Sequence, residues 1–209
     1  EGMWLPSLIS HRIGDMQEKG FKLNAEDIYS INQASLKDAV VLFGRGCTGE
    51  LISPEGLLIT NHHCAYGDVH KLSTPEHNYL DEGFWAMHSD EEVNINGKSV
   101  LFLKKVIDVT DEVNARKTEA EADKRPMGMR KLSYLIETEY KNKTGLEAYL
   151  SSMWDGSKYY IALYEVYKDV RLVAAPPVSA AAFGGDIDNW EWPQHKCDFA
   201  MYRIYTAPD

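Results

Sequence analysis

Short apolar runs recur along most of the chain and predict β-strands. The predicted strand segments are residues 40–43, 51–52, 57–59, 99–109, 158–175 and 198–205. The segment 158–175 is long enough for two strands around a turn near Lys168. The clearest hairpin lies at 51–59, because the turn residues Pro54-Glu55-Gly56 separate two apolar runs.

Helical periodicity is concentrated in one block, residues 111–152. Charges are dense from Asp111 to Arg125, Pro126 interrupts the run, and later apolar residues recur at helical spacing. A shorter helix is expected before Gly20, and Asn24 and Ser35 are expected to cap two short helices. We interpret the helical block as an insertion in one β-domain, so the predicted fold class is mainly β with helical insertions.

Composition and charge exclude some classes of function. The chain has 209 residues and a formal net charge of -10, which argues against non-specific nucleic-acid binding. No apolar run approaches the roughly 20 residues of a membrane span. Residue 1 is Glu, and we expect that a signal peptide has been removed.

The first candidate chemistry is at residues 46–64, where Cys47 and Cys64 lie near the two ends of the hairpin segment. The second strand is expected to run on through residues 60–64, which places two adjacent histidines at its end. A zinc cluster of His62, His63, Cys64 and His70 is an alternative. It fits poorly, because adjacent residues on a strand point to opposite faces.

The second candidate constellation is the segment 183–205. Gly184-Gly185 permits a tight backbone turn, and acids, an amide and indoles follow at residues 186–192. Asn189 and Trp190 lie in this loop, and Asp198 opens the strand after it. Loop packing is the alternative interpretation of Asn189 and Trp190.

Both constellations resemble chymotrypsin-like serine peptidases. Residues 47–52 (Cys-Thr-Gly-Glu-Leu-Ile) and 60–64 (Thr-Asn-His-His-Cys) match the family's histidine segment, and 198–204 (Asp-Phe-Ala-Met-Tyr-Arg-Ile) matches its acid strand. The resemblance implies the N-terminal barrel of a double β-barrel, a disulfide between Cys47 and Cys64, His63 as general base and Asp198 as its orienting acid. An imidazole suits the first role because its unperturbed pKa is roughly 6.5, and a buried carboxylate stabilises the imidazolium.

The narrower resemblance is to bacterial dipeptidyl-peptidases of the 7/11 type. It rests on Thr-Asn-His-His-Cys, on residues 184–195 (Gly-Gly-Asp-Ile-Asp-Asn-Trp-Glu-Trp-Pro-Gln-His), and on the opening Gly-Met-Trp-Leu-Pro. It implies a serine exopeptidase without cofactor or metal that releases dipeptides from oligopeptides, with Asn189 and Trp190 holding the free amine. It also implies a homodimer in the periplasm of a Gram-negative bacterium, or a secreted one. The chain departs from the family at Glu191, Gln194 and Cys197.

The nucleophilic serine has no counterpart here, since no Gly-X-Ser-X-Gly or Gly-Asn-Ser-Gly segment occurs. We therefore expect residues 1–209 to be the N-terminal barrel portion of a longer enzyme, with a helical insertion at about 111–152, and to be inactive alone. The second barrel and a large helical domain would lie outside it. A non-catalytic peptide-binding module on the same barrel is the alternative function. The peptidase hypothesis requires His63 within hydrogen-bond reach of Asp198.

Overall fold

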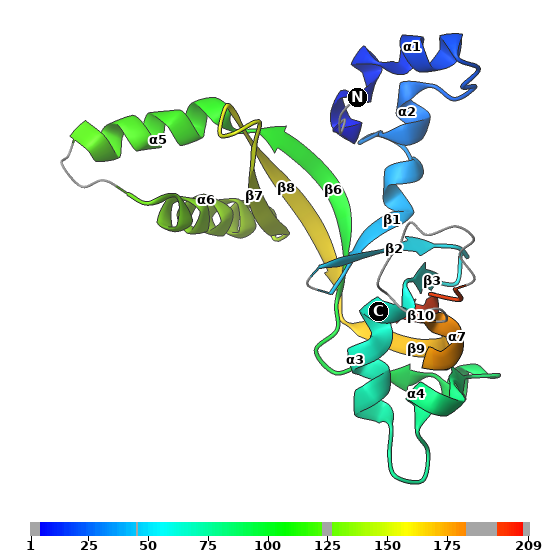
Figure 1. The fold of residues 1–209 in the computed structure, drawn as a ribbon. Helices are drawn as coiled ribbons and strands as arrows, with labels where there is room; N and C mark the ends of the chain where they lie inside the picture. The colour runs from blue at the N-terminus through cyan, green and yellow to red at the C-terminus, as the bar shows by residue number, and fades with distance from the viewer. Residues whose placement is uncertain (1–4, 45, 123–126, 183–195, 207–209) are drawn as a thin grey trace. The chain divides into compact units, whose positions relative to one another are not determined.

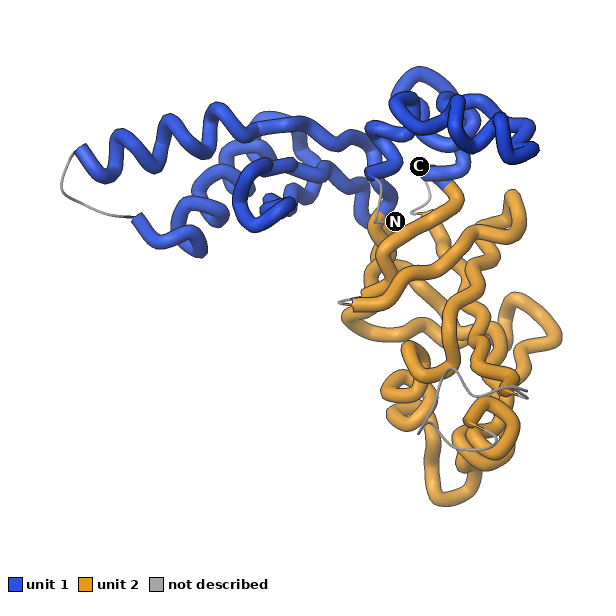
Figure 2. The backbone as a smooth tube through the Cα atoms, turned by 45° about the horizontal axis from the view of Figure 1, so that its top comes forward, with its two compact units in different colours: residues 1–38, 102–166 blue, residues 39–101, 167–209 orange. Residues whose placement is uncertain are grey.

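The computed structural model describes residues 5–44, 46–122, 127–182 and 196–206. The chain forms two compact units, coloured separately in Figure 2. Unit 1 comprises residues 1–38 and 102–166, and unit 2 comprises residues 39–101 and 167–209.

Unit 2 is built on an antiparallel sheet. Its strands are β1 (Val40–Phe43), β2 (Cys47–Leu51), β3 (Leu57–Thr60), β4 (Phe84–Trp85), β5 (Val93–Asn94), β9 (Asp169–Ala175) and β10 (Ala200–Tyr205). The order across the sheet is β4-β9-β10-β3-β2-β1, with β5 also paired to β9. The predicted hairpin is therefore confirmed as β2 and β3, and the mainly β prediction is confirmed (Figure 1). This antiparallel order is consistent with the predicted barrel.

Helices and 3-10 turns connect the strands of unit 2. They are α3 (His62–Leu72), α4 (Tyr79–Glu82), η3 (Ser89–Glu91) and α7 (Val178–Ala181). The prediction that residues 60–64 continue the strand is wrong, because β3 ends at Thr60 and α3 begins at His62. The reason is the burial pattern: His62, Ala65 and Val69 form one buried helical stripe.

The core of unit 2 is formed by side chains from the middle strands. Leu58, Leu172 and Tyr202 are fully buried on the neighbouring strands β3, β9 and β10. The rings of Phe43 and Tyr202 pack with their centroids 4.6 Å apart. Because Tyr202 lies four residues after Asp198, this packing holds the start of β10 in place.

Unit 1 combines the helical block with three long strands. These elements are β6 (Val100–Asp108, whose first two residues belong to unit 2), α5 (Thr110–Ala122), α6 (Met129–Thr144), β7 (Glu147–Met153) and β8 (Lys158–Tyr167, whose last residue belongs to unit 2). The strands lie in the order β6-β8-β7, and β7 and β8 form an antiparallel hairpin.

The helical block is shorter than the sequence predicts. The prediction of a helical block to residue 152 is wrong at its end, because residues 147–153 form β7. Gly145 takes a left-handed φ of 74° and ends α6, and the next residues pair with β8. A shared core fixes this arrangement, with Val113 and Ile136 from the helices packed against Ile161 of β8.

The first part of unit 1 consists of short helical turns: η1 (Pro6–His11), α1 (Ile13–Glu18), α2 (Ala25–Ile28) and η2 (Leu36–Asp38). Asn24 caps α2 through a capping box with Asp27, as predicted. The Oγ of Ser35, at the start of η2, accepts a hydrogen bond from the Ser30 N–H. In the described part of the chain, every helix is too short or too polar to cross a bilayer.

Candidate active site

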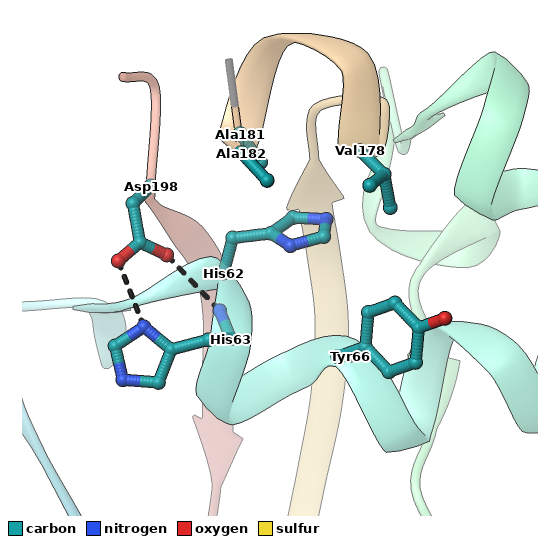
Figure 3. Close-up of a pocket in the computed structure, with 7 residues that line it drawn as sticks. All are labelled: His62, His63, Tyr66, Val178, Ala181, Ala182 and Asp198. Carbon is teal, nitrogen blue, oxygen red and sulfur yellow. Dashed lines mark hydrogen bonds and ion pairs between the residues drawn. The ribbon is translucent and has the colours of Figure 1, made fainter. Parts of the chain in front are cut away.

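The sheet of unit 2 brings His63 and Asp198 together. β3 pairs with β10 so that Thr60 lies opposite Ala200, which places the residues just beyond both positions at the same edge. There the Nδ1 of His63 lies 2.8 Å from Oδ2 of Asp198. The backbone N–H of His63 donates to Oδ1 of the same carboxylate at 3.0 Å (Figure 3). The distance that the peptidase hypothesis requires is therefore present.

The carboxylate of Asp198 is held as an anion. Burial alone would raise the pKa of Asp198, but hydrogen bonds from the His63 backbone and ring and from Asn61 outweigh burial and lower it. The side-chain amide of Asn61 donates to Oδ2 at 3.2 Å and to the Asp198 carbonyl at 3.3 Å. An ionised carboxylate only accepts, so the proton in the contact with His63 belongs to Nδ1.

The imidazole of His63 is open to its surroundings. Its side chain is 68% exposed, whereas that of Asp198 is 29% exposed. Figure 3 shows the second ring nitrogen, Nε2, pointing away from Asp198. With Nδ1 protonated, Nε2 carries the lone pair and can accept a proton from a group brought against it.

His62 has the opposite environment. It is 3% exposed, and within the described residues its Nε2 has no hydrogen-bond partner. Burial lowers the pKa of His62, and the His63 charge lowers it further, against a hydrogen bond with the Pro176 backbone and the charge of Asp198. His62 is therefore uncharged at neutral pH. The two adjacent histidines thus differ in exposure: the side chain of His63 is open to solvent, whereas His62 is buried.

A pocket of about 390 Å³ lies beside the His63–Asp198 pair. Its remaining wall is formed by His62, Tyr66, Val178, Ala181 and Ala182. Helix α3 and helix α7 with its C-cap residue Ala182 supply these side chains (Figure 3). No group of three metal-binding side chains occurs among the residues that the structure describes, which leaves the zinc alternative without support there.

The predicted disulfide is present. Cys47 of β2 and Cys64 of α3 are bonded, with their Cα atoms 6.2 Å apart. The bond ties the first turn of α3, where His63 lies, to the sheet. Cys197 is an exposed thiol and forms no disulfide with any described residue.

The predicted amine-binding residues Asn189 and Trp190 lie outside the described residues. The same holds for Glu191 and Gln194. The structure therefore brings together His63, Asp198, Cys47 and Cys64, and the amine site stays a prediction.

Sequence reasoning missed two contributors to the site. Sequence reasoning identifies Asn61 only as part of a motif and not as a hydrogen-bond donor to Asp198, although its place two residues before His63 is a usable signal. Asp68, buried on α3 five residues after His63, is not predicted as a buried acid either, because an Asp within a polar segment is usually exposed.

Comparison with known proteins gives a consistent result. The chain is 45% identical to dipeptidyl-peptidase 7 of Phocaeicola vulgatus, over 99% of this chain and 30% of that protein. It is also 45% identical to the Asp/Glu-specific dipeptidyl-peptidase of Porphyromonas gingivalis, again over 99% of this chain and 30% of the relative. The chain thus spans about 30% of the length of these curated relatives.

Solved structures agree with the sequence comparison. The crystal structure of Porphyromonas endodontalis DPP11 in complex with the dipeptide Arg-Glu matches with a TM-score of 0.87 and 42% identity. The match covers 98% of this chain and 31% of that one. The family model for peptidase S46 matches residues 1–209. The chain therefore belongs to the peptidase S46 family.

Proposed function

We propose that the chain is the His–Asp part of a serine dipeptidyl-peptidase that releases dipeptides from the free N-terminus of oligopeptides. The observation that carries the proposal is the double hydrogen bond between His63 and Asp198, at 2.8 and 3.0 Å. The names of the relatives support the substrate class, since these proteins are called dipeptidyl-peptidase 7 and Asp/Glu-specific dipeptidyl-peptidase.

In the proposed mechanism, His63 is the general base. Its Nδ1–H donates to Asp198, and its exposed Nε2 takes the proton from a serine hydroxyl supplied from outside residues 1–209. The serine oxygen then attacks the carbonyl carbon of the scissile bond, and the imidazolium returns the proton to the leaving amine as the C–N bond breaks. The dipeptide is then held on the serine as an ester. His63 takes a proton from water, which attacks this ester, and the imidazolium returns that proton to the serine oxygen as the dipeptide is released. The negative charge of Asp198 stabilises the imidazolium at both stages.

We further propose that residues 1–209 are the N-terminal barrel portion of the full enzyme, and that Asn189 and Trp190 bind the substrate's free α-amino group. An amide oxygen accepts hydrogen bonds from an ammonium group, so Asn189 has suitable chemistry. If the free amine is held at a fixed distance from the nucleophile, the space between them admits two substrate residues. The product released is then a dipeptide. Asn189→Ala in the full-length enzyme should raise KM for free-amine substrates by about tenfold or more, and an unchanged KM would remove Asn189 from the site.

The decisive experiment uses the full-length protein and dipeptidyl fluorogenic substrates with free and with blocked N-termini. Wild type should cleave the free form alone, and His63→Ala should lose about 10³-fold or more in kcat/KM. His70→Ala is the matched control, because His70 is exposed on the same helix and is absent from the pocket lining. Equal cleavage by wild type and His63→Ala would refute the mechanism.

The alternative proposal is a non-catalytic peptide-binding module, which predicts no cleavage by the folded wild type. Saturable binding of an oligopeptide with a free amine, measured by calorimetry on that same inactive protein, would then favour it.

We also propose that the full-length enzyme is located in an oxidising compartment and forms a homodimer. The Cys47–Cys64 disulfide supports export to the periplasm or the medium, because disulfides persist in such compartments. Fractionation of the native cells, and sedimentation of the full-length protein, test the two points. A cytoplasmic enzyme would contradict the first and a monomer the second.

A further inference from the structure

A buried charged contact joins the helix and the strand that carry His63 and Asp198. Asp68 of α3 is 7% exposed, and its Oδ2 accepts a hydrogen bond of 3.0 Å from the hydroxyl of Tyr202 on β10. The Nζ of Lys98 lies 2.7 Å from the same oxygen. We call Asp68, Tyr202 and Lys98 the buried triplet.

The triplet spans the same two elements as the proposed catalytic pair. Asp68 follows His63 by five residues on α3, about 7.5 Å along the helix axis. Tyr202 follows Asp198 by four residues and lies within β10. A helix needs two points to fix its direction. The first turn of α3 is held by the disulfide and by Asp198, and the buried triplet supplies the next point.

The chemistry of the triplet makes it a rigid contact. A buried carboxylate must be paired, and here one cation and one hydroxyl meet it. Burial and the nearby charge of Asp68 raise the pKa of Tyr202 strongly, so the phenol stays protonated and keeps donating. Lys98 also lies 4.5 Å from the centroid of the Phe43 ring, which packs on Tyr202. Each member therefore has a second neighbour that resists its displacement.

We propose that Asp68, Tyr202 and Lys98 are positioning residues, which set the direction of α3 and thereby the contact between His63 and Asp198. Among the described residues they make no hydrogen bond or ion pair with His63 or Asp198, and they act through the helix and the strand. This inference rests on the proposed function for its consequence in catalysis. Loss of the Tyr202 hydroxyl would let α3 tilt about its first turn and would loosen the contact of His63 Nδ1 with Asp198.

The test compares Tyr202→Phe with Tyr205→Phe in the full-length enzyme. Tyr205 is a matched control, because it lies on the same strand and its hydroxyl also donates to a carboxylate, Glu92, at 2.8 Å. That contact does not involve α3. Tyr202→Phe should lower kcat about tenfold with KM changed less than twofold, since misplacement of a catalytic group acts on the chemical step. Tyr205→Phe should stay within twofold of wild type in both constants.

A second readout distinguishes positioning from a general loss of stability, and it does not need activity. The His63 Nδ1 proton, shared with Asp198, should give a low-field NMR signal in wild type and in Tyr205→Phe. Tyr202→Phe should shift or broaden this signal at a temperature where all three proteins are folded. An unchanged signal together with an unchanged kcat would overturn the proposal.

The two failures are distinguishable. An inactive wild type with the NMR difference intact would refute the proposed function and keep the positioning role. If wild type is active, and Tyr202→Phe and Tyr205→Phe have the same kcat and the same NMR signal, the positioning role alone would be refuted. If Tyr202→Phe does not fold, Asp68→Asn and Lys98→Met replace it, and Lys98→Arg should restore kcat relative to Lys98→Met. The proposal would also be overturned if Lys98→Arg did not restore kcat and Asp68→Asn kept the kcat of wild type.

Discussion

The carboxylate of Asp198 accepts two hydrogen bonds from one residue, His63: one from the backbone N–H at 3.0 Å and one from the ring Nδ1 at 2.8 Å. The first bond fixes the backbone of His63 in the first turn of α3. The second fixes the orientation of its ring and the nitrogen that carries the proton. One anion thus sets both the position and the tautomer of the proposed base.

Asp198→Asn in the full-length enzyme should lower kcat by about 10³- to 10⁴-fold with little change in KM. An amide can present its N–H₂ to Nδ1, which favours the tautomer with the proton on Nε2, and such a ring cannot act as base. Steady-state kinetics on a free-amine dipeptidyl substrate measure the loss.

Asp169→Asn is the control for that variant. The pKa of Asp169 is also lowered, first by the side-chain hydrogen bond from Arg171, and Asp169 lies at the start of β9 without contact to His63. Its kcat should stay within twofold of wild type. A large loss in Asp169→Asn, or none in Asp198→Asn, would contradict the assignment of the acid.

Below about pH 6.5, the free energy of unfolding should fall partly because of His62. Burial lowers the pKa of this histidine in the folded state, so the unfolded chain binds a proton that the folded chain resists. The contribution is fully present above the unfolded pKa of roughly 6.5 and is lost as the pH falls. The lowered pKa of Asp198 affects stability in a separate pH range. Its contribution to the free energy of unfolding is lost only as the pH falls below the unfolded pKa of roughly 3.9.

Urea denaturation at pH 5.0 and 7.5 checks this expectation. His62→Gln should show a smaller difference between the two pH values than wild type, by at most about 1.4 kcal/mol per pH unit. His70→Gln is the control for replacing a histidine of this helix, since His70 is exposed whereas His62 is buried. Equal pH dependence in wild type and His62→Gln would contradict the buried neutral histidine.

Local sequence patterns predict those elements of the fold that are set by residues close together in the chain. The hairpin around Gly56 follows from its Pro-Glu-Gly turn and two apolar runs, and β10 follows from the alternation after Asp198. The pairing of Cys47 with Cys64 and of His63 with Asp198 came from the resemblance, which carries three-dimensional information that the residues themselves do not.

The features that the sequence did not predict depend on tertiary packing. The start of α3 at His62 could not be predicted from the adjacent strand, since the helical stripe of His62, Ala65 and Val69 begins with a polar residue. The contact of Asp68 with Tyr202 joins residues 134 positions apart, and local sequence periodicity cannot predict a contact between such distant residues. The sequence predicts helix where β7 lies, because the strand character of β7 comes from pairing with β8 and not from its own composition.

Removal of the disulfide should destabilise the protein by about 3 kcal/mol. Cys47 and Cys64 are 17 residues apart, and closing a loop of this size restricts the unfolded chain by about that amount. The double variant Cys47→Ala/Cys64→Ala, compared with wild type by urea denaturation, gives the value. In the full-length enzyme it should also lower kcat, because the bond anchors the turn that carries His63.

Cys197→Ala is the control for the disulfide. The Cys197 thiol is exposed and forms no disulfide with the described residues, so its removal should change the free energy of unfolding by less than about 0.5 kcal/mol. A comparable loss in both variants would show that the effect does not come from the Cys47–Cys64 bond.

Gly56→Ala should be among the most damaging single substitutions in the sheet of unit 2. Gly56 has a φ of +73°, and a Cβ at this position would lie 2.6 Å from the carbonyl oxygen of Ile204 on β10. The backbone cannot retreat easily, because the N–H of Ile204 donates to the Gly56 carbonyl at 3.0 Å. The left-handed conformation and the clash together should cost at least about 2 kcal/mol.

Gly14→Ala makes the same chemical change as Gly56→Ala, but we expect it not to destabilise the protein. Gly14 lies in α1, and an added Cβ would meet no atom within 4 Å. Alanine has the higher helix propensity, so this variant should be neutral or more stable by up to about 1 kcal/mol. Urea denaturation of both variants beside wild type decides the point. If Gly56→Ala were as stable as Gly14→Ala, the close approach of the β2–β3 turn to β10 would be refuted, and with it the register that places Thr60 opposite Ala200 and His63 beside Asp198.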